Sequence, residues 1–333
     1  MSLESELENA RPGDRILVRG RQVGGKIQNV RGTAQAWIEL VGEDDTATLI
    51  PEPGYPYAVI RFEDCQYLRV GGLRVEGDGN TERAVQVFRS DYIHLHDLHT
   101  SGVTQDHIHT PGCNHVLIQR LYSDGAGGEN MGGGKGGHAV YFTRVDGGGD
   151  CEDLVAEDCD CVGIWGAAYQ ANGDGRELYE VRFTRCRAEE YGRLGGSGVN
   201  LAYCRNPVLE DIILVPHALN DNPGIASFDG TTGTVMRRFD IDCDDLWSGP
   251  MEATAGEPEF PAPPGYEQEP SPGPEPPEPE PGPEPEPEEI TVPCVTCSGV
   301  GQVLAAIQPP EATEPALINC PTCLGRGTVT VES

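Results

Sequence analysis

The stretches YAVIRFEDCQYLRVGGLRVEG (residues 57–77), RAVQVFRSDYIHLHDLHTSG (83–102) and DHIHTPGCNHVLIQRLYSDG (106–125) repeat one pattern. Each consists of short strands of alternating character, separated by Gly, Asp or Asn, and weaker copies begin at positions 138, 162, 197 and 223. A period of roughly 23–35 residues predicts a solenoid, whose coils stack ~4.8 Å apart. A sandwich or barrel would instead show the tight turn dipeptides of hairpins, which are not evident.

Like residues recur at like places in these repeats. One apolar position per repeat is predicted to point inward, and it holds Ile60, Val85, Ile108, Val140, Ile164, Val199 and Ile225. A second inward column holds Leu73, Leu98, Leu121, Cys159 and Cys186. The cysteines in these columns are therefore interpreted as small apolar residues stacked inside the coils, rather than as metal ligands or disulfides.

The first coil adds a resemblance to a known superfamily. ARPGDRILVRGRQVGGKIQN begins at Ala10, and GTAQAWIELVGE begins at Gly32. These segments resemble the opening of the pectate-lyase-like right-handed parallel β-helix superfamily, whose members often begin with a "pGDtIlv" coil followed by a "GT...pItl.ge" coil. The resemblance covers residues 10 to about 246 and implies an all-β, right-handed parallel β-helix. It implies no single chemistry, because this fold hosts lyases, hydrolases, epimerases and viral spikes.

Composition limits the partners of the chain. The 333 residues carry 54 Asp and Glu against 23 Lys and Arg, a formal net charge of −31. Such a polyanion is expected to repel duplex nucleic acid. Acidity with only two lysines is typical of halophilic proteins, although an ordinary acidic protein is the alternative. No apolar run is long enough to insert into a membrane, and the N-terminus lacks the pattern of a secretion signal.

The chain divides into three predicted segments. Residues 1–256 form the β-helix, and residues 257–289 form a Pro/Glu-rich tract that predicts an extended polyproline-type linker. Residues 290–333 contain two CxxCxGxG knuckles, and they resemble half of the cysteine-rich domain of DnaJ-type co-chaperones. Two thiolates from each knuckle can hold one tetrahedral ion. We therefore expect one structural Zn²⁺ per chain, with the ligands Cys294, Cys297, Cys320 and Cys323.

The outer surface of one sheet is the predicted ligand-binding face. Because side chains alternate along a strand, the neighbours of the inward residues point outward. The predicted outward column holds Gln86, His109, Tyr141, Trp165 and Asn200, with His107 in a parallel column. Aromatic and hydrogen-bonding side chains of this kind suit a sugar chain, so we expect these residues to bind a glycan. Packing of Tyr141 and Trp165 beneath a loop is the alternative.

A catalytic interpretation rests on Asp106, His107 and His109. These groups could act in acid–base chemistry, although exposed histidines on a solenoid face are the simpler interpretation. Inverting glycoside hydrolysis needs two carboxyl groups ~6.5–9.5 Å apart, and Asp106 stands alone beside the predicted groove. No complete catalytic set is therefore predicted.

Two classes of function follow. The first is a structural virion protein of a tailed virus, namely a tail spike, a fibre, or a capsid decoration or turret. If the acidic composition reflects adaptation to salt, the host of the virus would be a halophilic archaeon. The protein would be made in the host cytoplasm without a signal peptide, assemble with other virion proteins as a homotrimer, and bind host-surface glycans. The alternative is a polysaccharide lyase or glycoside hydrolase of the superfamily named above. A cellular scaffold that uses the zinc module is a third possibility.

Overall fold

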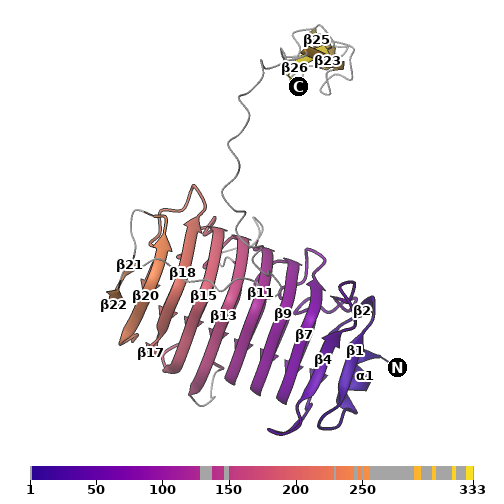
Figure 1. Cartoon of the computed structure of the whole chain (residues 1–333), viewed down its shortest axis with the longest axis vertical. Helices are drawn as coiled ribbons and strands as arrows, with labels where there is room; N and C mark the ends of the chain where they lie inside the picture. The colour runs from indigo at the N-terminus through magenta and orange to yellow at the C-terminus, as the bar shows by residue number, and fades with distance from the viewer. Residues whose placement is uncertain are drawn as a thin grey trace, which may run out of the picture. The chain divides into compact units, whose positions relative to one another are not determined.

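A computed structural model of the chain describes residues 2–127, 137–145, 150–228, 230–243 and 247–249, and the strands at 251–254, 289–293, 302–304, 317–319 and 328–332. The chain divides into two compact units, Met1–Ala262 and Pro263–Ser333. The first unit is a parallel β-solenoid (Figure 1), which confirms the predicted parallel β-helix. The predicted linker, residues 257–289, lies outside the described residues except for Glu289, which begins a strand.

Two parallel sheets form the walls of the solenoid. The larger sheet takes the long strands in the order β1 (Arg15–Val18), β4 (Ile38–Gly42), β7 (Gln66–Glu76), β9 (Asp91–Val103), β11 (Asn114–Ala126), β13 (Cys151–Ile164), β15 (Leu178–Tyr191), β18 (Val208–Pro216), β20 (Thr234–Ile241) and β22 (Met251–Thr254). Three short strands join its margins: β2 (Arg21–Val23), β5 (Thr48–Ile50) and β17 (Cys204–Arg205).

The second sheet consists of short strands that alternate along the chain with the long ones. Its order is β3 (Gly25–Gln28), β6 (Ile60–Glu63), β8 (Val85–Phe88), β10 (Ile108–Pro111), β12 (Val140–Thr143), β14 (Tyr169–Asn172), β16 (Val199–Ala202), β19 (Ile225–Ser227) and β21 (Trp247–Ser248). Each coil thus contributes one strand to each wall, and equivalent residues stack one coil apart.

The core lies between the two sheets. The register pairs Ile60 with Val85, Val85 with Ile108, and Ile108 with Val140, and all four side chains are fully buried. The predicted inward column is therefore confirmed over these coils. The described cysteines are free thiols, and burial raises the pKa of Cys65 to about 11, so that its thiol stays protonated. The cysteines buried in the coils are Cys65, Cys113, Cys151, Cys159, Cys161, Cys186 and Cys204.

The coil that contains β14 departs from the predicted register. Tyr169, rather than Ile164, occupies the inward position between β12 and β16. Its side chain is fully buried, and its hydroxyl lies 2.7 Å from the carbonyl oxygens of Cys159 and Arg187, to which it can donate. The phenol therefore connects the short-strand sheet to the long strands across the core. Ile164 instead ends β13, where it pairs with Ala126.

A charged ladder follows one bend of the long strands, where the backbone takes a left-handed conformation with φ of 47° to 55°. Acid and base alternate from coil to coil along it. Each Arg donates two hydrogen bonds to the Asp of the preceding coil, with N–O distances of 2.6–3.0 Å. Bidentate pairs of this kind fix the orientation of the guanidinium relative to the carboxylate, in addition to the attraction between their charges. The charged ladder comprises Asp97, Arg120, Asp158, Arg185, Asp211 and Arg238.

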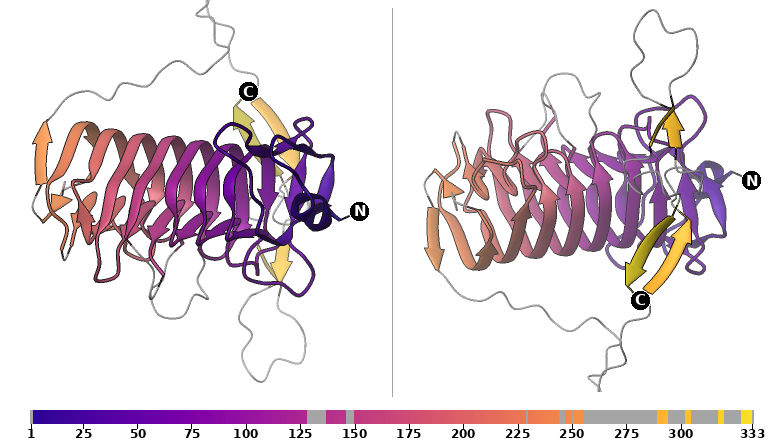
Figure 2. Two further views of the ribbon diagram at one scale, coloured as in Figure 1. Left: turned by 90° about the horizontal axis from the view of Figure 1, so that it is seen from below. Right: turned by 90° about the horizontal axis from the view of Figure 1, so that it is seen from above.

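A short helix covers the N-terminal end of the solenoid (Figure 2). Helix α1 (Leu3–Glu8) begins at its N-cap Ser2, whose hydroxyl accepts a hydrogen bond from the backbone N–H of Ser5 at 3.2 Å. Leu3 and Leu7 are buried against the first coil. The helix thus shields an apolar end that a solenoid would otherwise expose. In the described part of the chain, no helix is long and apolar enough to cross a membrane.

The second unit contains two antiparallel strand pairs. β23 (Glu289–Pro293) pairs with β26 (Thr328–Glu332), and β24 (Gln302–Leu304) pairs with β25 (Leu317–Asn319). The predicted zinc ligands Cys294, Cys297, Cys320 and Cys323 lie outside the described residues.

Candidate functional site

A continuous row of polar side chains crosses the outer face of the short-strand sheet. The register pairs each member with the next: Gln86 with His109, His109 with Tyr141, and Gln170 with Asn200. Because these residues alternate with the buried inward column, their side chains lie on the outer face. We call this the outer row, and in coil order it comprises Arg61, Gln86, His109, Tyr141, Gln170 and Asn200.

Trp165 is not a member of the outer row, and the prediction that placed it there is wrong. Gln170 occupies its place, because β14 begins at Tyr169 and residues 165–168 form the turn before it. Trp165 is half-buried in that turn, and the guanidinium of Arg193 lies 4.7 Å from its ring centroid. The row therefore presents an amide where an indole was expected.

A buried carboxylate lies beside the row, on the turn that precedes β10. Asp106 is 4% exposed, and it accepts hydrogen bonds from His138 Nδ1 at 2.7 Å and from Arg83 Nε at 3.2 Å. His109 Nδ1 lies 3.8 Å from the same carboxylate. Arg83 is also bonded to Glu82 and Gln105, so its position is fixed on several sides. Three consecutive coils thus converge on one negative charge.

The surroundings of Asp106 keep it ionised. Burial alone would raise its pKa, but the hydrogen bond from His138 and the charges of His138, His109 and Arg83 hold the pKa at about 2. An ionised carboxylate only accepts hydrogen bonds. Asp106 therefore cannot serve as a proton donor near neutral pH.

His109 and Tyr141 stack on each other along the outer row. Their ring centroids are 4.9 Å apart and the ring planes differ by 9°, so His109 covers one face of Tyr141. His138 contacts the same tyrosine, with a centroid distance of 4.9 Å. Burial lowers the pKa of His109 to about 4, although the charge of Asp106 acts in the opposite direction. His109 is therefore a neutral ring near pH 7.

His107 does not belong to the groove, contrary to the prediction. It precedes β10, its side chain is fully buried, and neither ring nitrogen has a hydrogen-bond partner among the described residues. Burial lowers its pKa to about 3, so the ring is neutral. His107 stands before β10 begins at Ile108, so the alternation that predicted an outward direction does not apply to it.

The groove itself encloses about 370 Å³ beside the outer row. Polar groups from the row meet backbone from two glycine-containing turns in its lining. Among the described residues, Asp106 is the only carboxylate in this lining. The lining comprises Arg83, Gln105, Asp106, His138, Tyr141, Gly166, Ala167, Gln170, Gly195, Gly196 and Asn200.

Several polar atoms of the outer row have no hydrogen-bond partner among the described residues. They include Gln86 Oε1 and Asn200 Oδ1, and Gln86 is only 7% exposed. Asn200 Nδ2 donates to Gln170 Oε1 at 3.5 Å, and both side chains line the groove. A buried polar atom without a partner costs about 1–3 kcal/mol. Protein atoms cover these two oxygens, so the groups that a ligand can reach are those of the groove lining.

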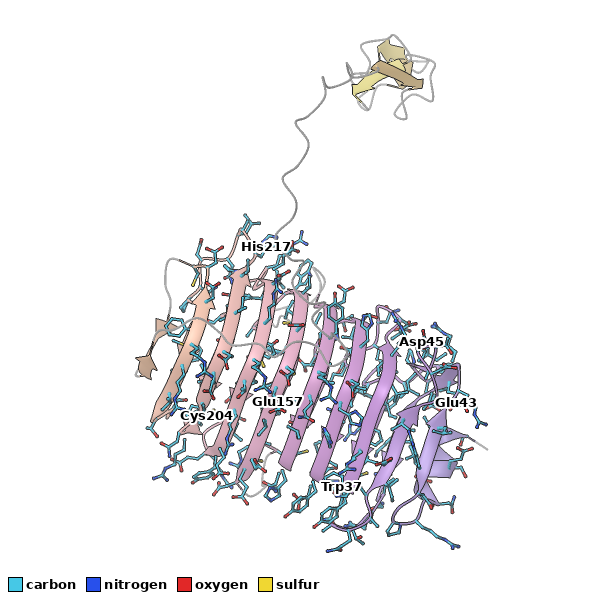
Figure 3. All side chains as sticks on the ribbon, in the orientation of Figure 1. Trp37, Glu43, Asp45, Glu157, Cys204 and His217 are labelled. Carbon is cyan, nitrogen blue, oxygen red and sulfur yellow. The ribbon has the colours of Figure 1, made fainter. Side chains whose placement is uncertain are left out.

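The other clustered histidines lie on the long-strand sheet. His94 and His96 are on β9, and His94 Nε2 bonds to Gln119 Oε1 at 2.7 Å. Gln119 in turn bonds to Glu157, which lies midway along β13 (Figure 3). Within the described ranges, no group of three or more His, Cys, Asp or Glu side chains is arranged to hold a metal ion. Because His94 and His96 lie on the long-strand sheet, they are separate from the groove, which lies beside the short-strand sheet.

The sequence interpretation did not assign roles to His138, Arg83 or Gln170. Arg83 and His138 each stand just before the Ala-Val pair that begins a strand of the short-strand sheet, a position that recurs in the repeats. Asp106 and His107 occupy the related positions before β10. Charged or titratable residues therefore recur just before the strands of the short-strand sheet, and this recurrence in the sequence could have identified the cluster around Asp106.

Described strands flank the two CxxCxGxG segments. Pro293, which precedes Cys294, pairs with Thr328, which follows the second knuckle. Gln302, which follows the first knuckle, pairs with Asn319, which precedes Cys320. The residues on either side of the two knuckles are therefore paired, and the bound zinc ion stays a prediction.

No family model matches the chain, and no curated protein matches it in sequence. Some solved structures are similar to the chain at low sequence identity. A Geobacillus virus E2 protein, ORF18, matches 72% of this chain with 14% identity and a TM-score of 0.48, and the chain spans about half (53%) of that protein. Pectate lyase Pel9A matches 77% of this chain and 73% of its own, with 10% identity and a TM-score of 0.48.

Tailspike protein 2 of Escherichia coli O157:H7 bacteriophage CAB120 matches 68% of this chain and 39% of its own, with 10% identity and a TM-score of 0.34. At these identities the similarity concerns the fold alone.

Proposed function

We propose that this chain is a glycan-binding structural protein of a virus particle, and that the outer row of the β-helix holds the glycan. The observation that carries the proposal is the polar lining of the groove, where Tyr141, Gln170 and Asn200 of the outer row meet the charged groups around Asp106. Sugars supply many hydroxyl groups, each of which both donates and accepts. A sugar chain is therefore the ligand class that best satisfies such a row.

The geometry of the row suits a linear ligand. Its members repeat once per coil, at the ~4.8 Å spacing of paired strands, so that a chain lying along the solenoid meets one side chain after another. Tyr141 is only partly buried and lines the groove, where its ring can contact a sugar. Gln170 and Asn200 then provide amide groups on the following coils.

The virion assignment is supported by the organisation of the chain. A Pro/Glu tract separates the solenoid from a small cysteine-rich unit, an arrangement that suits a receptor-binding body tethered to a particle. The partners in this proposal are other virion proteins and, in a homotrimer, two further copies of the chain. Mass spectrometry of purified particles tests it, and absence of the protein from such particles would contradict it.

Glycan binding is tested on the full chain with an array of surface polysaccharides from candidate hosts, followed by titration calorimetry on any hit. We expect Asn200→Ala to weaken binding at least 5-fold, because a truncated amide loses its hydrogen bonds to the ligand. Gln119→Ala is the matched control, because this amide lies on the long-strand sheet. Equal loss in both variants, or binding by neither variant nor wild type, would refute the assignment of the outer row.

A polysaccharide lyase or glycoside hydrolase is the second candidate, and the observation in its favour is the contact of Asp106 with His138 inside the groove. Glycoside hydrolysis by two carboxyl groups is not supported, because Asp106 is the one carboxylate that the described residues place in the lining. Release of reducing ends or of unsaturated products from a bound polysaccharide would establish this candidate.

A further inference from the structure

We propose that the groove also contains an acid–base site, in which His138 activates a water molecule to hydrolyse an acyl ester of the bound glycan. This inference rests on the proposed glycan-binding function, and it names the substrate class as an O-acylated sugar chain. His138 would be the catalytic residue, Asp106 its positioning residue, and Tyr141 and Gln170 part of the wall that holds the sugar.

The orientation of His138 makes it a base. Its Nδ1 lies 2.7 Å from Asp106 Oδ1, and because an ionised carboxylate only accepts, the proton of the neutral ring is on Nδ1. The lone pair is then on Nε2. The side chain is 15% exposed and lines the groove, and none of the described residues forms a hydrogen bond with Nε2. This atom can therefore take a proton from a water molecule in the groove.

Asp106 is held firmly enough to support that role. Arg83 Nε donates to its second oxygen at 3.2 Å, and Arg83 is itself bonded to Glu82 at 2.6 Å and to Gln105 at 2.8 Å. The carboxylate fixes the tautomer of His138 and stabilises the imidazolium that forms when Nε2 is protonated. Burial strengthens both effects, because few water molecules screen the charges.

The chemistry of the lining favours ester hydrolysis over cleavage of the sugar chain. Hydrolysis of a glycosidic bond needs a carboxylic acid as well as a carboxylate, and Asp106, the one carboxylate that the described residues place in the lining, stays ionised. Elimination across a uronate needs a free cation to neutralise the sugar carboxylate, whereas Arg83 already bonds to three protein groups. Ester hydrolysis needs one base that later returns its proton, and His138 can do both.

The proposed step balances in atoms and charge. Nε2 of His138 accepts a proton from water while the water oxygen bonds to the acyl carbon, and the carbonyl π electrons move to the carbonyl oxygen. The tetrahedral intermediate then collapses, and the bond between the acyl carbon and the sugar oxygen breaks. That oxygen receives the proton from Nε2. The products are the sugar alcohol and a carboxylic acid, which releases its proton to the solvent.

The test uses the full chain with a panel of O-acetylated polysaccharides, starting with acetylated xylan, and NMR detection of released acetate. We expect His138→Asn to lower kcat by 10²-fold or more, because it removes the base but keeps a side-chain amide that can donate to Asp106. Asp106→Asn is the second variant, and it should lower kcat by favouring the wrong tautomer of His138. His99→Asn, on the long-strand sheet, is the control and should leave kcat unchanged.

The outcomes separate the two proposals. Three results together support the role of His138 as a base. Both groove variants lose acetate release, both still bind the de-acetylated glycan, and the wild-type rate rises with pH through one ionisation. Glycan binding without acetate release by wild type, or equal release by wild type and His138→Asn, overturns this inference and leaves the glycan-binding function standing. No binding to any glycan overturns the glycan-binding function itself.

Discussion

The buried His107 is expected to make the solenoid sensitive to mild acid. Its pKa is about 3 in the folded chain and about 6.5 in an unfolded one, because burial disfavours the charged ring. Between these values the unfolded chain binds more protons than the folded chain, so stability rises with pH. Relative to pH 7, the loss from His107 amounts to ~2 kcal/mol at pH 5 and ~3 kcal/mol at pH 4.

The assay is urea denaturation of wild type and His107→Leu at pH 7, 6, 5 and 4, followed by circular dichroism. Leucine fills a similar volume and cannot titrate, so the free energy of unfolding of the variant should fall less steeply. The difference between the two curves isolates His107, because His109 contributes equally to both. Any constant offset that arises from packing does not affect this comparison.

A surface histidine provides the control. His217 directly follows the C-terminal end of β18, where its Nδ1 accepts a hydrogen bond from the backbone N–H of Leu219 (Figure 3). His217→Gln is expected to follow the wild-type curve. If the curve of His107→Leu also runs parallel to that of wild type from pH 7 to pH 4, the ring is not held neutral in the interior, and the reasoning from burial fails.

Four further expectations can be checked on the same protein. Tyr169→Phe should lower the free energy of unfolding by about 1–3 kcal/mol in urea, because two buried carbonyl oxygens lose the phenol hydroxyl; an unchanged midpoint would contradict this. Arg185→Gln breaks a partly exposed pair of the charged ladder and should cost about 1 kcal/mol, less at high salt; a loss that does not depend on salt would argue against an electrostatic cause. We propose that the full chain binds one Zn²⁺, and elemental analysis should show that Cys294→Ser loses it; wild type free of metal would end that proposal. Finally, a salt-adapted surface predicts that the thermal midpoint of wild type rises with KCl, since screening relieves repulsion within a chain of net charge −31.

The parallel β-helix could be predicted from the sequence because stacking imposes the same burial pattern on every coil. Ile60, Val85 and Ile108 repeat at matching places, and only a solenoid superimposes such residues. The register failed at one coil because Tyr169 is a large polar residue at an inward position. Its hydroxyl finds partners across the core, and alternation of polarity along the strand does not reveal such partners.

The candidate site was predictable in part. Gln86, His109, Tyr141 and Asn200 do share one row, because alternation fixes the face of each strand residue. His138 could not be paired with Asp106 by alternation, since both precede their strands and their directions depend on the turns. Knowledge of the three-dimensional contacts was therefore needed to join them.

The charged ladder restricts how this solenoid can change in length. Acid follows base on successive coils, and Arg120 lies between Asp97 and Asp158 along the stack. Loss of a single coil would set two like charges against each other at the new junction, whereas loss of two neighbouring coils would restore the alternation. Insertions and deletions in related chains should therefore add or remove two coils at a time, because only such steps preserve the alternation of acid and base.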